Sequence, residues 1–174
     1  MADLSNNGAG FLLAHEGFVG RYYLDSVGIG TIGIGFTWRS SAFQKWWAVN
    51  KKVRFGPGAT MTRAEAQDAL IYLVANEYGK SVNAFFDPLK QHQFDAAASV
   101  VYNCGAGTLD DKWAAALKKG LIATAADLLE TTRLTAKGRR LAGLVRRRKE
   151  EAALLEFGVY TGVKAPIDAM ADGM

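Results

Sequence analysis

The stretch EGFVGRYYLDSVGIGTIGIG, residues 16–35, determines the fold that we expect for this chain. The segments RYYLD and TIGIGF alternate with period two on either side of the turn SVGIG, which predicts a β-hairpin. An apolar helix is predicted over residues 3–15 just before it, and Gly17 is its stop signal. Glu16 therefore lies at a helix end, directly ahead of the hairpin.

One face of this hairpin is expected to carry few large side chains. Tyr23 and Asp25 share a face of the first strand. Thr31, Gly33 and Gly35 share a face of the second strand. Because glycine in a strand often marks close approach by a ligand or by backbone, this face is a candidate binding surface.

The rest of the chain is predicted to be mostly helical. A helix is expected over 62–79, beginning with a Thr62–Glu65 capping box, and another over 88–104, with Pro88 in its first position. Two short helices are expected in DDKWAAALKKG and TAADLLETT, and a long one over 137–157. This order predicts a single α+β domain over residues 1–174, with a small β lobe and a larger helical lobe. The expected parts are a β lobe at about 18–60, a helical lobe at about 1–16 and 62–160, and a tail at 161–174.

The amino-acid composition and the net charge limit the classes of protein to which this chain can belong. The 174 residues are 49% hydrophobic and 22% charged, as in ordinary globular domains. The net charge of +4 favours an anionic partner such as a cell-wall polymer, nucleic acid or acidic membrane. No nucleic-acid reading motif accompanies the charge, so we expect no nucleic-acid partner. Cys104 is the single cysteine and is expected to be a small buried thiol.

No segment resembles a secretory signal or a membrane span. The N-terminus lacks a basic region, and no run approaches the about 18 apolar residues that a span requires. We therefore expect neither export by this chain alone nor stable membrane insertion.

Cofactor chemistry finds little support in the sequence. Gly28, Gly30 and Gly33 spell G-x-G-x-x-G, but a strand follows them where a dinucleotide site needs a helix. His15 and His92 are far apart and belong to no metal-binding motif. We expect no metal and no organic cofactor.

Glu16 and Asp25 are the strongest candidates for chemistry. Glycoside hydrolysis needs one protonated carboxyl for the leaving oxygen and a second group that manages water or the sugar cation. A partly buried glutamate can keep its proton near neutral pH, while an aspartate at a hairpin mouth stays ionised. Spacing alone leaves open that Glu16 only ends a helix and Asp25 only forms a turn.

The pattern E-x8-D-x5-T within HEG…YYLDSVGIGTIGIG resembles the catalytic signature of the phage-type (T4-type) lysozymes, glycoside hydrolase family 24. MTRAEAQDAL, QFDAAASVVYNCGAG and KGRRLAGLVRRRKEEAALL resemble three further blocks of that family, in the same order. The resemblance implies a lysozyme-like α+β fold with the active-site cleft between the two lobes.

The resemblance also implies residue roles. Glu16 corresponds to the general acid, Asp25 to the catalytic carboxylate, and Thr31 to the hydroxyl that helps to position water. Substrate contacts are expected from Tyr23, Gly33, Gly35, Ser99 and Asn103. For Asn103, a helix-capping role is equally open.

The activity implied is hydrolysis of the β-1,4 bond between N-acetylmuramic acid and N-acetylglucosamine in peptidoglycan, with inversion. As in phage endolysins of this family, a monomer would accumulate in the host cytoplasm until a separate holin-type partner releases it to the wall. A lytic transglycosylase and a non-catalytic wall-binding or assembly protein on the same fold remain alternatives.

Three features need separate interpretation. Phe36 stands where the family usually has histidine, and Trp38–Lys52 resembles an insertion relative to short members. The aromatic residues of this insertion are expected to pack a helix in preference to forming a lid. Most of the basic residues near the last helix are expected to lie on a solvated face, with i,i+4 pairs Arg146–Glu150 and Arg147–Glu151. Binding of anionic wall polymers or of peptide-stem carboxylates by this cluster remains an alternative; its members are Arg139, Arg140, Arg146, Arg147, Arg148 and Lys149.

Overall fold

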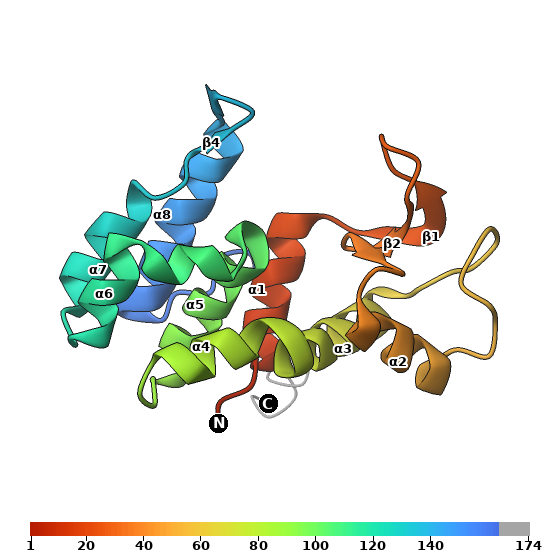
Figure 1. Ribbon diagram of the computed structural model, residues 1–174, viewed down its shortest axis with the longest axis horizontal. Coiled ribbons are helices and arrows are strands. Elements are labelled where there is room, and N and C mark those ends of the chain that lie inside the picture. The colour runs from red at the N-terminus through yellow and green to blue at the C-terminus, as the bar shows by residue number, and fades with distance from the viewer. Residues whose placement is uncertain (164–174) are drawn as a thin grey trace, which may run out of the picture.

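The computed structural model describes residues 1–163; residues 164–174, most of the expected tail, lie outside that part. Helix α1 (Asn6–Glu16) stands between a small sheet with one helix on one side and a group of helices on the other (Figure 1). The sheet side holds β1 (Val19–Leu24), β2 (Gly30–Gly33), β3 (Phe36–Thr37) and α2 (Ser41–Asn50). Helix α3 (Arg63–Leu73) lies beside α2 and leads through η1 (Val74–Tyr78) from the sheet side to the helical side (Figure 1). The helical side holds α4 (Gly79–Phe85), α5 (Gln91–Cys104), η2 (Ala106–Asp110), α6 (Lys112–Lys118), α7 (Ile122–Glu130), β4 (Thr135–Ala136), β5 (Arg139–Arg140) and α8 (Ala142–Phe157).

The predicted hairpin is present as β1 and β2, which pair antiparallel with Tyr23 opposite Thr31. The segment TIGIGF is not one strand, because the chain turns at Ile34–Gly35 and returns as β3. Gly33 and Gly35 have φ angles of 69° and 96°, which glycine adopts without steric cost. The prediction that Gly35 lies on a strand face beside Thr31 is therefore wrong.

Several helix boundaries differ from the prediction for local reasons. Helix α1 begins at Asn6, because the Ser5 hydroxyl accepts the N–H of Gly8 at 2.9 Å and caps it. Helix α5 begins at Gln91 and not at Pro88, with the Gln93 side chain accepting the N–H of Lys90 at 3.1 Å.

Helix α8 begins at Ala142 and not at Lys137. The preceding residues form the hairpin β4–β5, which Figure 1 shows projecting beyond the end of α8. Lys137 and Gly138 have φ angles of 50° and 75° at its turn, and such angles end a right-handed helix.

The helix that starts at Thr62 confirms the capping box but not the predicted end. The Thr62 hydroxyl accepts the N–H of Glu65 at 3.1 Å, and the Glu65 carboxylate accepts the N–H of Thr62 at 2.8 Å. The helix does not stop at Gly79 but passes through the π-helical turn η1 and continues as α4 to Phe85.

The aromatic residues of α2 form the core of the sheet side. Phe43, Trp46 and Trp47 are buried, and Phe36 stacks on Phe43 with ring centroids 5.1 Å apart. The predicted packing role of the paired tryptophans agrees with this burial. Phe36 takes part in the same cluster, which explains an apolar ring at that position.

The helical side packs around α5. Phe94, Ala97 and Val101 on this helix are buried, and α1, α4 and α8 surround it. Among residues 1–163, no helix has both the length and the apolar character that crossing a bilayer requires.

Candidate active site

Glu16 is the last residue of α1, and Gly17 ends the helix with a φ angle of 70°. The Glu16 side chain is one-fifth exposed (20%) and accepts a hydrogen bond from the Nη1 of Arg147 on α8. A buried guanidinium from the helical side thus fixes the carboxyl at the point where the chain leaves for the hairpin.

Asp25 follows β1 and organises the hairpin turn. Its Oδ1 accepts the N–H of Val27 at 2.9 Å and the N–H of Ile29 at 2.8 Å. The aspartate therefore has the turn-forming role that the sequence left open. No hydrogen bond from residues 1–163 reaches its second oxygen, so Oδ2 is available for a further contact.

Thr31 lies on β2, opposite Tyr23 on β1. Its hydroxyl donates to the carbonyl oxygen of Ile29 at 2.9 Å, and the residue is almost buried. Because the N–H of Ile29 also donates to Asp25, the peptide groups of one residue hold both side chains. The structure therefore brings Asp25 and Thr31 together around the backbone of Ile29.

Gly33 and Gly35 do not form the open binding surface that the sequence predicted. A Cβ on Gly33 would meet the Met61 sulfur and the Phe36 ring at 2.8 Å. Close packing inside the sheet side therefore explains why position 33 holds a glycine. Gly35 is exposed in the turn, with open space around its Cα.

Ser99 is fully buried, so the expectation that it contacts substrate directly is wrong in this structure. Its hydroxyl donates to Glu151 at 2.6 Å, and the Nε of Arg147 donates to the same carboxylate oxygen at 3.0 Å. Ser99 thus belongs to the network behind Arg147. Asn103 is exposed, and its side-chain oxygen accepts a hydrogen bond from Arg148.

Arg147, Arg148 and Glu151 form a buried ionic cluster that sequence analysis missed. The predicted pairs Arg146–Glu150 and Arg147–Glu151 are present, but Arg147 is only 5% exposed and Arg148 is fully buried. The prediction of a solvated face is therefore wrong for these two arginines. The signal was available, because Arg148 lies four residues before Ala152, on the buried side of α8.

Two titratable groups beside Glu16 respond to this environment. Burial, together with the charges of Arg147, Arg146 and Arg148, lowers the pKa of His15 to about 4. Burial raises the pKa of Tyr102, and the Glu16 carboxylate adds to that rise, so its phenol stays protonated.

Cys104 is partly exposed, which differs from the buried thiol that we expected. Its sulfur lies 3.1 Å from the Nη2 of Arg148. Nowhere in residues 1–163 do three His, Cys, Asp or Glu side chains gather in a way that could hold a metal ion.

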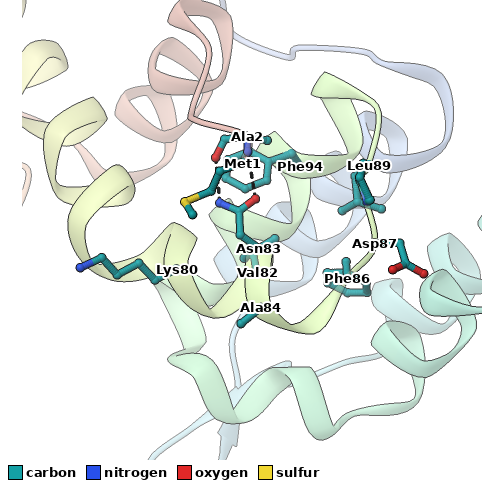
Figure 2. Close-up of a pocket in the computed structure, with 11 residues that line it drawn as sticks. Met1, Ala2, Lys80, Val82, Asn83, Ala84, Phe86, Asp87, Leu89 and Phe94 are labelled. Carbon is teal, nitrogen blue, oxygen red and sulfur yellow. Dashed lines mark hydrogen bonds between the residues drawn. The ribbon is translucent and has the colours of Figure 1, made fainter.

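One large hollow lies away from these groups. It measures about 650 Å³ and lies between the N-terminus and α4, where Ala2 and Asn83 exchange two hydrogen bonds of 3.0 and 2.8 Å (Figure 2). Phe86, Leu89 and Phe94 give it a mainly apolar lining. It contains none of the candidate catalytic residues.

Residues 13–151 match the family described as phage lysozyme, which covers Glu16, Asp25, Thr31 and the ionic cluster of α8. The chain belongs to the phage lysozyme family. It is 37% identical over 98 residues to the endolysins of Lactococcus phages c2 and phivML3, a match that covers 56% of this chain and 41% of each relative. The chain thus spans about two fifths of the length of these curated relatives.

Two solved structures resemble this chain over most of its length. A mutant of P22 lysozyme has a TM-score of 0.73 and 27% identity, over 89% of this chain and 99% of that one. The endolysin of Escherichia coli O157:H7 phage FAHEc1 has a TM-score of 0.68 and 27% identity, over 91% of this chain and 96% of that one. These likenesses confirm the predicted lysozyme-like α+β fold.

Proposed function

We propose that this protein is a peptidoglycan muramidase that hydrolyses the β-1,4 bond between N-acetylmuramic acid and N-acetylglucosamine, with inversion. The observation that carries the proposal is the arrangement of three groups within the region matched to the family. Glu16 is held by Arg147 at the end of α1, and Asp25 and Thr31 are held by Ile29 on the hairpin that follows.

Each group has a distinct role in the proposed reaction. Protonated Glu16 donates its proton to the glycosidic oxygen as the bond from the anomeric carbon to that oxygen breaks. A water molecule attacks the anomeric carbon from the opposite face of the sugar, and Asp25 accepts a proton from it. The Thr31 hydroxyl helps to orient this water, and Arg147 acts as a positioning residue for Glu16.

Replacing Glu16 tests the acid assignment. We expect Glu16→Gln to slow the clearing of a purified peptidoglycan suspension by at least about a hundredfold, because the amide has no acidic proton to donate. The exposed Glu130, at the end of α7, provides the matched control, and Glu130→Gln should clear at the parental rate. Equal clearing by the Glu16 variant and the parent would contradict the assignment.

The products distinguish the proposed reaction from its alternatives. Proton NMR of a digested soluble glycan should show the α-anomer first, because single displacement inverts the anomeric centre. Anhydromuramyl ends in mass spectra would instead identify a lytic transglycosylase. Wall binding by the parent protein without any new glycan ends would identify a non-catalytic protein.

We further propose that the peptidoglycan glycan strand is the macromolecular partner and that the protein acts as a monomer. Resemblance to phage endolysins supports accumulation in the host cytoplasm and release to the wall by a separate holin-type partner.

A further inference from the structure

A second hollow lies on the sheet side, against the face of the hairpin that Thr31 does not occupy. It measures about 560 Å³ and is lined mainly by Tyr22, Trp38, Trp47, Phe55, Arg39 and Arg54. Side chains alternate along a strand, so Tyr22 points away from Tyr23. A Cβ on Gly30 would meet the Tyr22 hydroxyl oxygen at 2.3 Å, which places the Tyr22 ring over Gly30. We call this hollow the aromatic–arginine pocket.

Four aromatic rings that pack against one another line the aromatic–arginine pocket. The Trp38 ring lies parallel to that of Phe55, with centroids 5.0 Å apart and planes 12° from parallel. Tyr22 and Trp47 meet Phe55 edge-on at 5.2 and 5.4 Å. Trp38 is nevertheless 43% exposed, so part of its flat apolar surface faces water. Such a surface suits the apolar face of a pyranose ring.

The indole N–H of Trp38 is available to a ligand. The indoles of Trp46, Trp47 and Trp113 donate to Asp68, the Val53 carbonyl and Thr108 at 2.7, 2.8 and 3.1 Å. Trp38 has no such acceptor among residues 1–163. The indole N–H of this lining residue is therefore free to donate to a hydroxyl or carbonyl of a bound sugar.

Arg39 and Arg54 give the aromatic–arginine pocket a positive charge. Both are exposed, and neither forms an ion pair with a carboxylate in residues 1–163. A guanidinium presents a planar fork of N–H donors that fits a carboxylate with two parallel hydrogen bonds. Two unpaired guanidinium groups beside a sugar-sized aromatic surface favour a ligand that combines a pyranose ring with an anion.

We infer that the aromatic–arginine pocket binds a pyranose that carries an ionised carboxylate, such as a muramic acid residue of peptidoglycan whose lactyl group bears no stem peptide, outside the site of bond cleavage. The inference rests on the proposed function, because it assigns this pocket to the same polymer. The pocket holds a wall strand against the sheet side while the other face of the hairpin presents Asp25 and Thr31.

The test compares two sugars that differ in the carboxylate. We titrate ¹⁵N-labelled protein with N-acetylmuramic acid, N-acetylglucosamine and sn-glycerol 3-phosphate, and we follow the four indole N–H signals. We expect N-acetylmuramic acid to shift the Trp38 signal with a Kd at least about fivefold below that of N-acetylglucosamine. An unmoved Trp38 signal or equal Kd values for the two sugars would overturn the inference. Glycerol phosphate that binds as tightly as N-acetylmuramic acid would also overturn it, in favour of a phosphate site.

A variant without the charges of Arg39 and Arg54 tests whether these arginines cause the preference for N-acetylmuramic acid. In the double variant Arg39→Gln, Arg54→Gln the preference for N-acetylmuramic acid over N-acetylglucosamine should disappear. The unshifted indole signals of Trp46 and Trp113, which do not line the pocket, report that the variant is folded. An unchanged preference in this folded variant would contradict the role of the arginines.

Failure of this inference and failure of the proposed function give different results. Full clearing activity in Glu16→Gln would refute the acid assignment and would leave the sugar titration of Trp38 unaffected. A parent protein that clears the wall, but whose Trp38 signal ignores both sugars, would refute only the pocket.

Discussion

At the residue scale, His15 and Glu16 are neighbours at the end of α1, and each contacts a charged residue of α8. Glu16 accepts from Arg147, and the Nε2 of His15 lies 2.9 Å from a carboxylate oxygen of Glu150. The His15 ring also packs edge-on against Phe11, with centroids 4.7 Å apart. Glu150 favours a charged imidazole, but burial and the arginines of α8 oppose it, and these opposing effects are larger.

This balance predicts a stability loss in mild acid. The pKa of His15 is about 4 in the folded protein against an ordinary value of 6.5, so the folded state binds fewer protons between these values. The contribution of His15 to stability is therefore complete above pH 6.5 and is lost as the pH falls towards 4. Urea unfolding at pH 7 and pH 4.5 should show a smaller pH-dependent drop in His15→Gln than in the parent. Equal drops in the two proteins would contradict the prediction.

The candidate site could be predicted only where its contacts are local. Asp25, Ile29 and Thr31 lie within one hairpin, so strand alternation and spacing were enough to group the carboxylate with the hydroxyl. The contact between Arg147 and Glu16 joins residues 131 positions apart, and no local pattern encodes such a pair. Ser99 was misassigned for the same reason, because only packing against α8 shows that it is buried.

At the element scale, the turn η1 explains why the helix from Thr62 does not end at Gly79. The N–H of Gly79 donates to the carbonyl of Val74, five residues earlier, which is the π-helical pattern. A Cβ on Gly79 would meet that carbonyl oxygen at 2.7 Å and the Phe94 ring at 3.2 Å. This glycine makes room for a wider helical turn and for α5, and it is not a stop signal.

A glycine-to-alanine pair tests this explanation. Alanine normally stabilises a helix by about 0.5–1 kcal/mol over glycine, but Gly79→Ala should destabilise the protein by about 1–3 kcal/mol through the clash with Val74. Gly143 of α8 has open space around its Cα, so Gly143→Ala is the matched control and should be neutral or stabilising. Thermal unfolding measures both; a higher Tm for Gly79→Ala would refute the clash.

Helices with a strong hydrophobic periodicity were predicted well, but the residues at which they begin and end were not. Proline at a first helical position is favourable, yet α5 begins three residues after Pro88, where Gln93 can accept the N–H of Lys90. The composition of the basic stretch before α8 predicts a helix. The positive φ of Lys137, which is uncommon for a residue other than glycine, could not be predicted from it.

At the scale of the whole molecule, Asp95 of α5 joins segments from both ends of the described chain. Its buried carboxylate accepts from the Ser5 N–H at 3.1 Å, the Ser5 hydroxyl at 2.5 Å, the Gln91 amide at 3.0 Å and the Tyr160 hydroxyl at 2.7 Å. A Cβ on Gly8 would meet its Cγ at 2.6 Å, so α1 approaches α5 closely at this point. The start of α1 and the segment after α8 are thus attached to the same carboxylate.

Removing this carboxylate should weaken the fold more than an ordinary surface change. Asp95→Ala leaves several donors without an acceptor, and we expect a loss of at least about 2–3 kcal/mol in the free energy of unfolding. Asp127 of α7 is exposed, so Asp127→Ala should change that free energy by less than about 0.5 kcal/mol. Equal unfolding midpoints in urea for the two variants would contradict this role of Asp95.

The peptide groups of Ile29 allow the two faces of the hairpin to evolve separately. All three of its hydrogen bonds with Asp25 and Thr31 use the backbone atoms of Ile29, and the residue also lines the aromatic–arginine pocket. Every residue other than proline supplies the same N–H and the same carbonyl. Mutations at position 29 can therefore change what the pocket selects while Asp25 and Thr31 keep their hydrogen bonds, and related proteins can diverge in wall preference without losing the chemistry.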